Sequence, residues 1–173
     1  MLRADLLENL KRLDEDACLM YPGEERFRLV IVGGSALILL EVISRSTQDI
    51  DVLNVSREIR GLLDKYDINC NVQTYINNFP YNYEDRLKPV LIHGEKIDFF
   101  TASLEDIVIA KLFSYRDTDW QDIIMDSVVQ ALDWELLDRI VKSDEEVRMN
   151  ALNERNYQEF LYNYEEYVRR YRP

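Results

Sequence analysis

The sequence predicts an α/β fold, with a small mixed β-sheet, flanking helices and a helical C-terminal part. Two observations predict it. Short apolar and β-branched runs alternate with helical segments through residues 1–102, whereas residues 103–173 show only helical spacing. The chain has 173 residues, of which 47% are hydrophobic, so it can bury a sizeable core. We therefore expect a single domain that consists of these two parts.

The first three elements follow from apolar spacing. Residues on one helical face, Leu2, Leu6, Leu10, Leu13 and Ala17, predict an N-terminal helix that ends at Pro22-Gly23. The run Arg-Leu-Val-Ile-Val over residues 28–32 predicts a buried strand. Ser35–Ile43 is apolar at nearly every position and predicts a buried helix that starts at the Gly33-Gly34 pair.

The glycine pair between this strand and this helix is typical of an anion site. Free backbone N–H groups at a helix start, with the helix dipole behind them, attract phosphate. Glycines let the phosphate come close, and Ser35 can cap the helix or donate to the ligand. Without a ligand, Gly33-Gly34 is simply a tight strand–helix turn.

Residues 49–52, Asp-Ile-Asp-Val, predict a strand with paired carboxylates. Because side chains alternate along a strand, Asp49 and Asp51 share one face while Ile50 and Val52 turn to the core. Two neighbouring carboxylates repel unless a cation lies between them, and oxygen ligands suit Mg²⁺. Asp-x-Asp also occurs at 14/16, where a solvated helix face is expected, and at 117/119. Only the 49/51 copy follows a glycine turn.

Turn-forming residues and capping patterns mark the remaining elements. A helix is expected over 56–66, and residues 74–89, rich in Asn, Tyr and Pro, predict an irregular, mobile substrate loop. Residues 90–93 and 96–100 predict a hairpin, with Asp98 on the face opposite Ile97 and Phe99. A Ser103-x-x-Asp106 capping pattern opens the helix of Lys111, and a second one at 143–146 starts a helix that runs towards Arg170.

Together these motifs resemble a known family. Gly34-Ser35 followed by Asp49-x-Asp51 resembles the signature of the DNA polymerase β-type nucleotidyltransferases. The run Gly-Gly-Ser-Ala-Leu with Arg45 resembles, more narrowly, the minimal AbiEii-type branch, which includes toxins of toxin–antitoxin systems. A second block is similar to that branch's lysine-bearing helix and its Arg-Asp-x-x-Asp run: Ser103 to Lys111, then Arg116, Asp119 and Asp122.

The resemblance implies a polymerase β-type fold and two sets of site residues. The catalytic and Mg²⁺-binding carboxylates would be Asp49, Asp51 and Asp98, the last helping to activate the attacking hydroxyl. The nucleotide-binding residues would be Gly33, Gly34, Ser35, Arg45 and Lys111. Read without the family, Asp98 is a polar outward residue of a hairpin. Lys111 is then a snorkelling lysine at the edge of an apolar stripe. As a phosphate ligand it would be exposed, and Lys111→Ala would weaken NTP binding while costing less than about 1 kcal/mol of stability. For Asp119 and Asp122 we expect structural pairing with Arg116 or Lys111.

The implied reaction is Mg²⁺-dependent transfer of a nucleotidyl group from an NTP to an acceptor hydroxyl, with release of pyrophosphate. The acceptor is left open between a small molecule, a protein side chain and a tRNA 3′ end. The alternative is a catalytically silent protein that serves as a binding or regulatory partner. In a toxin–antitoxin setting its partner would be an antitoxin, or else another copy of the chain.

Composition limits these alternatives. A net charge of −12 argues against a broad nucleic-acid-binding face. Neither a targeting nor a membrane-spanning segment is recognised, which predicts a cytoplasmic protein. The two cysteines, Cys18 and Cys70, are expected to be reduced core thiols, and the single histidine, His93, a strand residue that makes zinc improbable. The tyrosine-rich tail predicts helix packing or a dimer contact rather than base stacking.

Overall fold

The structure is a computed structural model that describes residues 1–173, except for the side chains of residues 73 and 74. The chain forms two compact units. The sheet unit contains Met1–Thr74 and Leu87–Ala102, and the helical unit contains Tyr75–Arg86 and Ser103–Pro173. The second unit therefore takes a short segment, residues 75–86, from the middle of the first.

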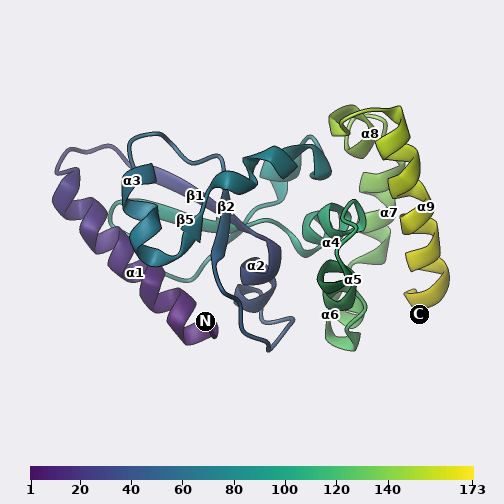
Figure 1. Ribbon diagram of the computed structural model, residues 1–173, viewed down its shortest axis with the longest axis horizontal. Coiled ribbons are helices and arrows are strands. Elements are labelled where there is room, and N and C mark those ends of the chain that lie inside the picture. Colours follow the sequence, from purple (N-terminus) through teal and green to yellow (C-terminus); the bar gives the residue numbers. More distant parts are fainter. The chain divides into compact units, whose positions relative to one another are not determined.

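The sheet unit contains a five-stranded mixed sheet, which confirms the predicted fold class (Figure 1). In chain order its elements are α1 (Arg3–Met20), β1 (Phe27–Val32), α2 (Gly33–Leu39), β2 (Ile50–Leu53), α3 (Arg60–Leu63), η1 (Asp64–Tyr66), β3 (Ile68–Asn69), β4 (Lys88–Pro89) and β5 (Ile97–Thr101). The strand order is β3-β2-β1-β5-β4. The pairs β1–β5 and β2–β3 are parallel, and the other two are antiparallel.

Helix α1 packs through the predicted apolar face and is fastened to the sheet by Asp14. The side chains of Leu6, Leu10, Leu13 and Ala17 are fully buried, whereas Leu2, the N-cap residue, is exposed. The prediction that Asp14 lies on a solvated face is wrong. Its buried carboxylate accepts backbone N–H groups of residues 95, 96 and 97 at 2.6–2.9 Å, which satisfies donors that the entry into β5 would otherwise leave unpaired.

Strand β1 agrees with its prediction, but helix α2 ends four residues before the predicted Ile43. Glu41 adopts a left-handed backbone conformation with φ 62°. Its N–H donates to the carbonyl of Ile38, and the N–H of Val42 donates to that of Leu37, each at 3.1 Å. This is the Schellman arrangement that closes a helix. The apolar pattern alone predicted a helix that is too long, because no glycine marks the end of α2.

The region between β2 and β5 differs from the prediction in three places. Only Arg60–Leu63 of the expected helix over 56–66 is α-helical, and η1 follows it. The predicted irregular loop over 74–89 contains the end of η2 (Asn71–Asn78), all of η3 (Tyr83–Arg86) and β4. The hairpin partner of β5 is β4 instead of residues 90–93, so His93 lies in a loop rather than a strand.

The helical unit confirms the predicted helical C-terminal part. It contains α4 (Leu104–Leu112), α5 (Asp117–Ile123), α6 (Asp126–Ala131), α7 (Trp134–Lys142), α8 (Val147–Asn150) and α9 (Glu154–Tyr171). The expected helix from Ser143 to Arg170 is in fact split into α8 and α9, because Asn153 caps a new helix by accepting the N–H of Asn156 at 2.9 Å. None of the described helices combines the length and the apolar character needed to cross a bilayer.

Aromatic side chains of α9 form much of this unit's core. Phe160 stacks on Phe113 with ring centroids 4.4 Å apart, and Tyr167 stacks on Trp134 at 5.4 Å. The hydroxyl of the buried Tyr167 donates to the Ile123 carbonyl at 2.7 Å, so its polar end is satisfied. The tyrosine-rich tail therefore packs internally, as predicted.

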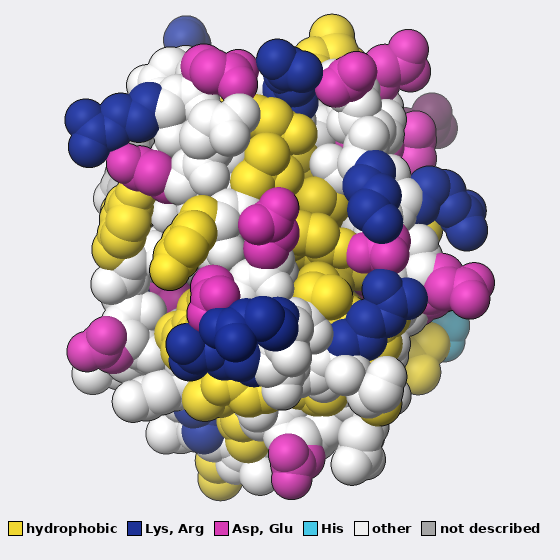
Figure 2. All heavy atoms as spheres, turned by 90° about the vertical axis from the view of Figure 1, so that its right-hand side faces the viewer, with side chains coloured by type: hydrophobic (Ala, Val, Ile, Leu, Met, Phe, Trp, Pro, Cys, Tyr) yellow, Lys and Arg dark blue, Asp and Glu magenta, His cyan; other side chains and the backbone are white. Residues whose placement is uncertain are grey.

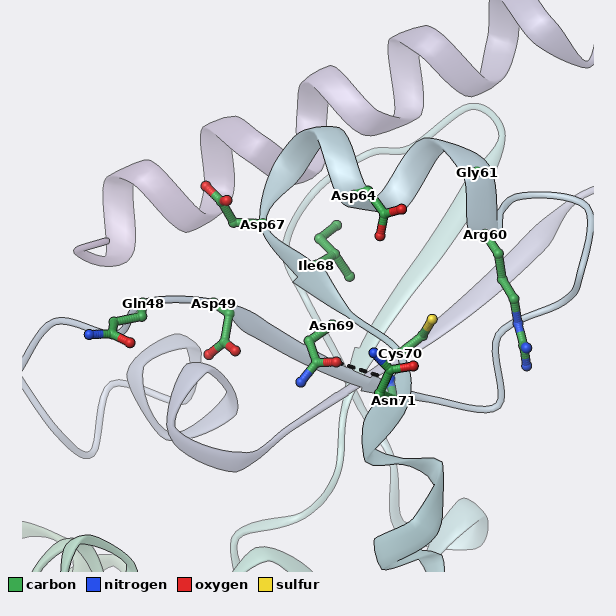
Figure 3. A pocket seen from close by; sticks show the side chains of 10 residues that line it. All are labelled: Gln48, Asp49, Arg60, Gly61, Asp64, Asp67, Ile68, Asn69, Cys70 and Asn71. Atoms are coloured by element: carbon green, nitrogen blue, oxygen red, sulfur yellow. Dashed lines mark hydrogen bonds between the residues drawn. The ribbon is translucent and has the colours of Figure 1, made fainter.

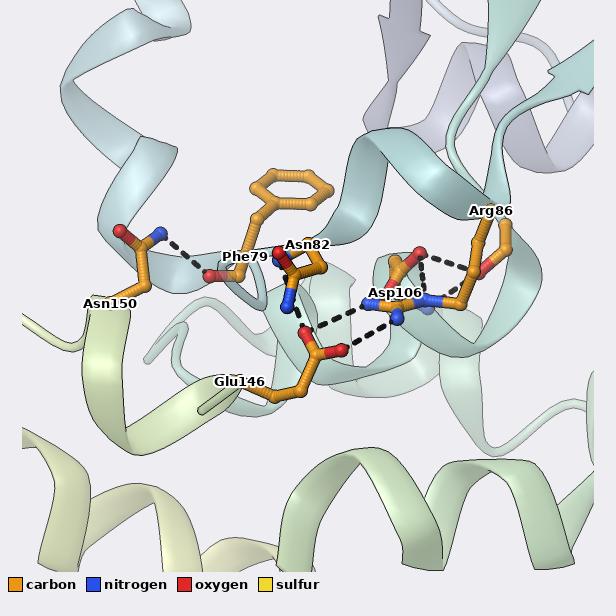
Figure 4. Close-up of polar contacts among 7 residues, drawn as sticks. Phe79, Asn82, Arg86, Asp106, Glu146 and Asn150 are labelled. Carbon is orange, nitrogen blue, oxygen red and sulfur yellow. Dashed lines mark hydrogen bonds and ion pairs between the residues drawn. The ribbon is translucent and has the colours of Figure 1, made fainter. Parts of the chain in front are cut away.

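Arg86 holds the segment 75–86 within the helical unit (Figure 4). Its guanidinium donates to the Asp106 carboxylate at 2.9–3.1 Å and to the Glu146 carboxylate at 2.8 and 3.2 Å. Close by, the Asn150 amide donates to the Phe79 carbonyl at 2.8 Å. Burial disfavours the charged arginine, but its two carboxylate partners outweigh that cost and raise the pKa of Arg86.

Glu146 makes the stability of the helical unit depend on pH. Burial acts to raise its pKa, but hydrogen bonds from Arg86 and from the backbone of Asn82 hold the pKa below its ordinary value of 4.5. A carboxylate with a lowered pKa stabilises the fold above its unfolded pKa, and the stabilisation is lost as pH falls through the folded pKa.

We therefore expect the stability contributed by Glu146 to be fully present from pH 7 to about 5 and to be lost as pH falls below about 4.5. Glu146→Gln should be less stable at pH 7 by about 1.5–3 kcal/mol, the range for hydrogen bonds to a charged group. The two proteins should converge as pH falls through the lowered pKa of Glu146. Urea unfolding at each pH measures this, with Glu145→Gln as the exposed control. Parallel pH curves for the wild type and Glu146→Gln would contradict it.

Candidate functional site

Asp51 and Arg45 lie directly over the glycine pair. The end of β1 pairs with the start of β2, with Val32 opposite Asp51. Gly33 has φ 66°, and a Cβ atom there would lie 3.0 Å from Asp51 Oδ2; a Cβ atom on Gly34 would lie 2.6 Å from Arg45 Nη2. Any side chain at position 34 would displace the guanidinium, and position 33 needs a left-handed backbone. Glycine is thus favoured at position 33 by the backbone conformation, whereas at position 34 it leaves room for the Arg45 guanidinium.

Ser35 serves the turn itself. Its hydroxyl is buried and donates to the Val32 carbonyl at 2.9 Å. The structure thus gives Ser35 a backbone partner within the turn. This differs from the expected cap, in which the hydroxyl would accept a helix N–H, because α2 begins at Gly33 with Val32 as its N-cap residue.

An asparagine that the sequence did not indicate completes the surroundings of Asp51. Asn69 lies opposite Asp51 in the β2–β3 pairing, and its Nδ2 donates to Asp51 Oδ1 at 3.0 Å. The N–H of Asn71 donates to Asn69 Oδ1 at 3.0 Å, which fixes the orientation of the amide. Asn69 therefore positions the Asp51 carboxylate. Only the pairing of two distant strands brings it there, so no local motif could have identified it.

Asp49 precedes β2 and lines a pocket of about 690 Å³ (Figure 3). The other lining residues are Gln48, Arg60, Gly61, Asp64, Asp67, Ile68, Asn69, Cys70 and Asn71. They come from the segment before β2, from α3 and η1, and from β3 and the residues after it. All of them belong to the sheet unit, so the pocket and the Asp51 surroundings lie in the same unit, around β2 and β3.

The structure does not bring Asp98 to this site. Asp98 pairs with Arg28 in β5, whereas Asp51 pairs with Val32, four residues further along β1. At about 3.3 Å per residue the two positions are separated by roughly 13 Å along the strands. Asp98 instead forms an ion pair with Arg26 at 2.5 Å, and hydrogen bonds from Arg26 hold the pKa of Asp98 below its ordinary value.

Lys111 belongs to the helical unit and is buried, whereas its sequence pattern suggested an exposed edge. Its ammonium contacts Asp119 at 2.5 Å and Asp122 at 2.9 Å. Arg116 also contacts Asp119, at 2.8 Å. Burial acts to raise the pKa of Asp119, but the charge of Lys111 and hydrogen bonds from Lys111 and Ser114 hold it below its ordinary value. The predicted structural pairing of Asp119 and Asp122 is therefore confirmed.

The chemistry of this arrangement favours a metal held jointly with a ligand. Among the residues that the structure describes, no cluster of three or more His, Cys, Asp or Glu side chains could hold a metal ion. Mg²⁺, however, is often bound by one or two carboxylates together with substrate phosphates and water. Asp49 and Asp51 beside a glycine turn with an arginine fit that second mode.

A mixed sheet whose glycine turn lies against Asp51 and the Arg45 guanidinium defines a candidate phosphate-binding protein. The family model described as "Nucleotidyltransferase of unknown function (DUF6036)" matches residues 8–172. The chain belongs to this family. The match supports the nucleotidyltransferase resemblance but does not reach the narrower AbiEii-type branch. No curated protein and no solved structure matches the chain.

Proposed function

We propose that the protein is a Mg²⁺-dependent nucleotidyltransferase that transfers an NMP group from an NTP to an acceptor hydroxyl and releases pyrophosphate. One observation carries this proposal: Asp51 and Arg45 both lie directly over the Gly33-Gly34 backbone. A phosphate at this turn would meet a guanidinium and would lie beside the carboxylates that suit a phosphate-bound metal ion.

Each residue has a distinct role in this proposal. Asp49 and Asp51 would hold Mg²⁺, which neutralises charge that develops on the transferred phosphoryl group. Arg45 offers a planar fork of donors to phosphate oxygens. Asn69 holds the Asp51 carboxylate in one orientation, and the glycines allow the phosphate to approach the backbone. In this proposal Asp98, which pairs with Arg26, does not hold the same metal.

A second candidate function is favoured by the position of Asp98. Without a third carboxylate beside Asp51, the site would bind Mg²⁺ and a nucleotide without activating an acceptor hydroxyl. The protein would then act as a nucleotide-responsive binding or regulatory partner, for instance of an antitoxin if it belongs to the AbiEii-type branch. The acidic composition suits a protein or small-molecule partner better than tRNA.

Thermal unfolding tests nucleotide binding. Because two carboxylates bind Mg²⁺ weakly until phosphates complete its coordination, Mg²⁺ alone and NTP alone should each raise the melting temperature little. Together they should raise it clearly, since a ligand at about a hundred times its Kd adds roughly 2.7 kcal/mol. The absence of a joint shift with any of the four NTPs would refute the enzymatic function and would leave a catalytically silent partner protein that does not bind nucleotide.

Transfer is tested separately from binding. Incubation of the protein with α-³²P-labelled NTPs, Mg²⁺ and a cell extract should label one acceptor, whose size and protease or nuclease sensitivity define its class. A joint melting shift without labelling of any component would favour the second candidate function.

A further inference from the structure

The pocket beside Asp49 is separate from the Gly33-Gly34 turn, where the phosphates are proposed to bind. Its volume of about 690 Å³ lies within the range of ligand sites, about 300–1,000 Å³. It adjoins the proposed metal site through two side chains, because Asp49 lines it directly and Asn69 both lines it and donates to Asp51. A substrate with its phosphates at the glycine turn would therefore place a neighbouring group in this pocket.

The lining is rich in hydrogen-bond acceptors (Figure 3). Asp64 and Asp67 are exposed residues of the lining. Their carboxylates make no hydrogen bond or ion pair with any described residue. Ionised carboxylates only accept hydrogen bonds. Arg60 is the single cationic residue of the lining, against three aspartates. Such a lining repels a triphosphate and favours a neutral group that carries several donors.

We propose that this pocket holds the nucleoside of the NTP and favours a base with an exocyclic amino group. This inference rests on the proposed function. Ribose hydroxyls and the amino groups of adenine, cytosine and guanine are donors that Asp64 and Asp67 can accept. Uracil has no exocyclic amino group, and its carbonyl oxygens would face carboxylates. The charge of the lining thus orients the NTP, with its phosphates towards Arg45 and its base towards β3.

Cys70 reports occupancy of the pocket because it is a lining residue and a free thiol. In the intact wild-type protein, Mg²⁺ with ATP should slow alkylation of Cys70 by N-ethylmaleimide, measured by mass spectrometry of its peptide. At about a hundred times the Kd, only about one site in a hundred is empty, so the rate should fall up to about a hundredfold. Cys18 on α1 is outside the lining and is the internal control, whose alkylation rate should not change.

Base preference is tested by titrating the four NTPs in the presence of Mg²⁺. UTP should bind at least about tenfold more weakly than ATP, CTP or GTP, as expected for the loss of one hydrogen bond to a charged group. The double variant Asp64→Asn/Asp67→Asn should reduce this difference, whereas Asp85→Asn, an exposed aspartate of η3, should preserve it. Asparagine tolerates the left-handed backbone of residue 67, φ 54°, so the variant should stay folded.

The outcomes separate this inference from the proposed function. A joint melting shift with Mg²⁺ and ATP, but an unchanged alkylation rate of Cys70, would reject the pocket as the nucleoside site and leave nucleotide binding intact. Protection of Cys70 with equal affinity for UTP would reject the base preference. The absence of any joint shift would reject the proposed function first.

Discussion

Replacing Asp51 by asparagine should abolish nucleotidyl transfer while the protein stays folded. The substitution keeps the size of the side chain but removes the charge that Mg²⁺ requires, and loss of a metal ligand lowers activity by orders of magnitude. Asp51 lies near Asp49, so neutralising it also relieves like-charge repulsion and should not lower stability. Transfer is measured with labelled NTP, and folding by circular dichroism and urea unfolding.

The same variant should lose the joint melting shift with Mg²⁺ and NTP. Asp98→Asn is the matched control, because it removes a carboxylate on the same sheet that pairs with Arg26 instead of approaching Asp51. It should keep both the joint shift and the transfer activity. If Asp98→Asn were as inactive as Asp51→Asn while still binding Mg²⁺ and NTP, the role implied by the family resemblance would be restored. Full activity of Asp51→Asn would eliminate the proposed metal site.

Replacing Lys111 by alanine should destabilise the protein by about 3–5 kcal/mol, the range for removing one partner of a buried ion pair. The loss of one ammonium leaves Asp119 and Asp122 close together, buried and without their main counter-charge. This reverses the expectation from sequence, which treated Lys111 as exposed and its replacement as nearly neutral. Urea unfolding of the wild type and the variant measures the difference.

Two further variants test the reason for this effect. Lys142→Ala removes an exposed lysine that pairs with Asp138 in the same unit, and should cost only about 0.2–1 kcal/mol. The triple variant Lys111→Met/Asp119→Asn/Asp122→Asn removes the charges together and should recover much of the lost stability. If Lys111→Ala left the free energy of unfolding unchanged, the buried cluster would contribute no stability, and Lys111 would again become a candidate for nucleotide binding.

The sequence by itself determined the parts of the fold that depend on near neighbours. The apolar spacing of α1, the β-branched run of β1 and the alternation Asp49-Ile50-Asp51-Val52 each describe a local conformation, and the fully buried Ile50 and Val52 agree with it. The glycine pair also predicted a turn with an accessible backbone. In the structure, the Asp51 and Arg45 side chains lie close to that backbone.

Only the tertiary structure decided which distant residues meet. The register of β5 on β1 places Asp98 away from Asp51, and the pairing of β3 with β2 places Asn69 beside it. Neither register is encoded in the spacing of either strand, because alternation fixes the face of a side chain but not its level along the sheet. The burial of Lys111 and Asp14 could not be predicted from the sequence either. A charged group can be buried only where partners from other segments pair with it, and the fold decides where they meet. The sequence therefore proposed three carboxylates, and only strand pairing decided which of them lie together.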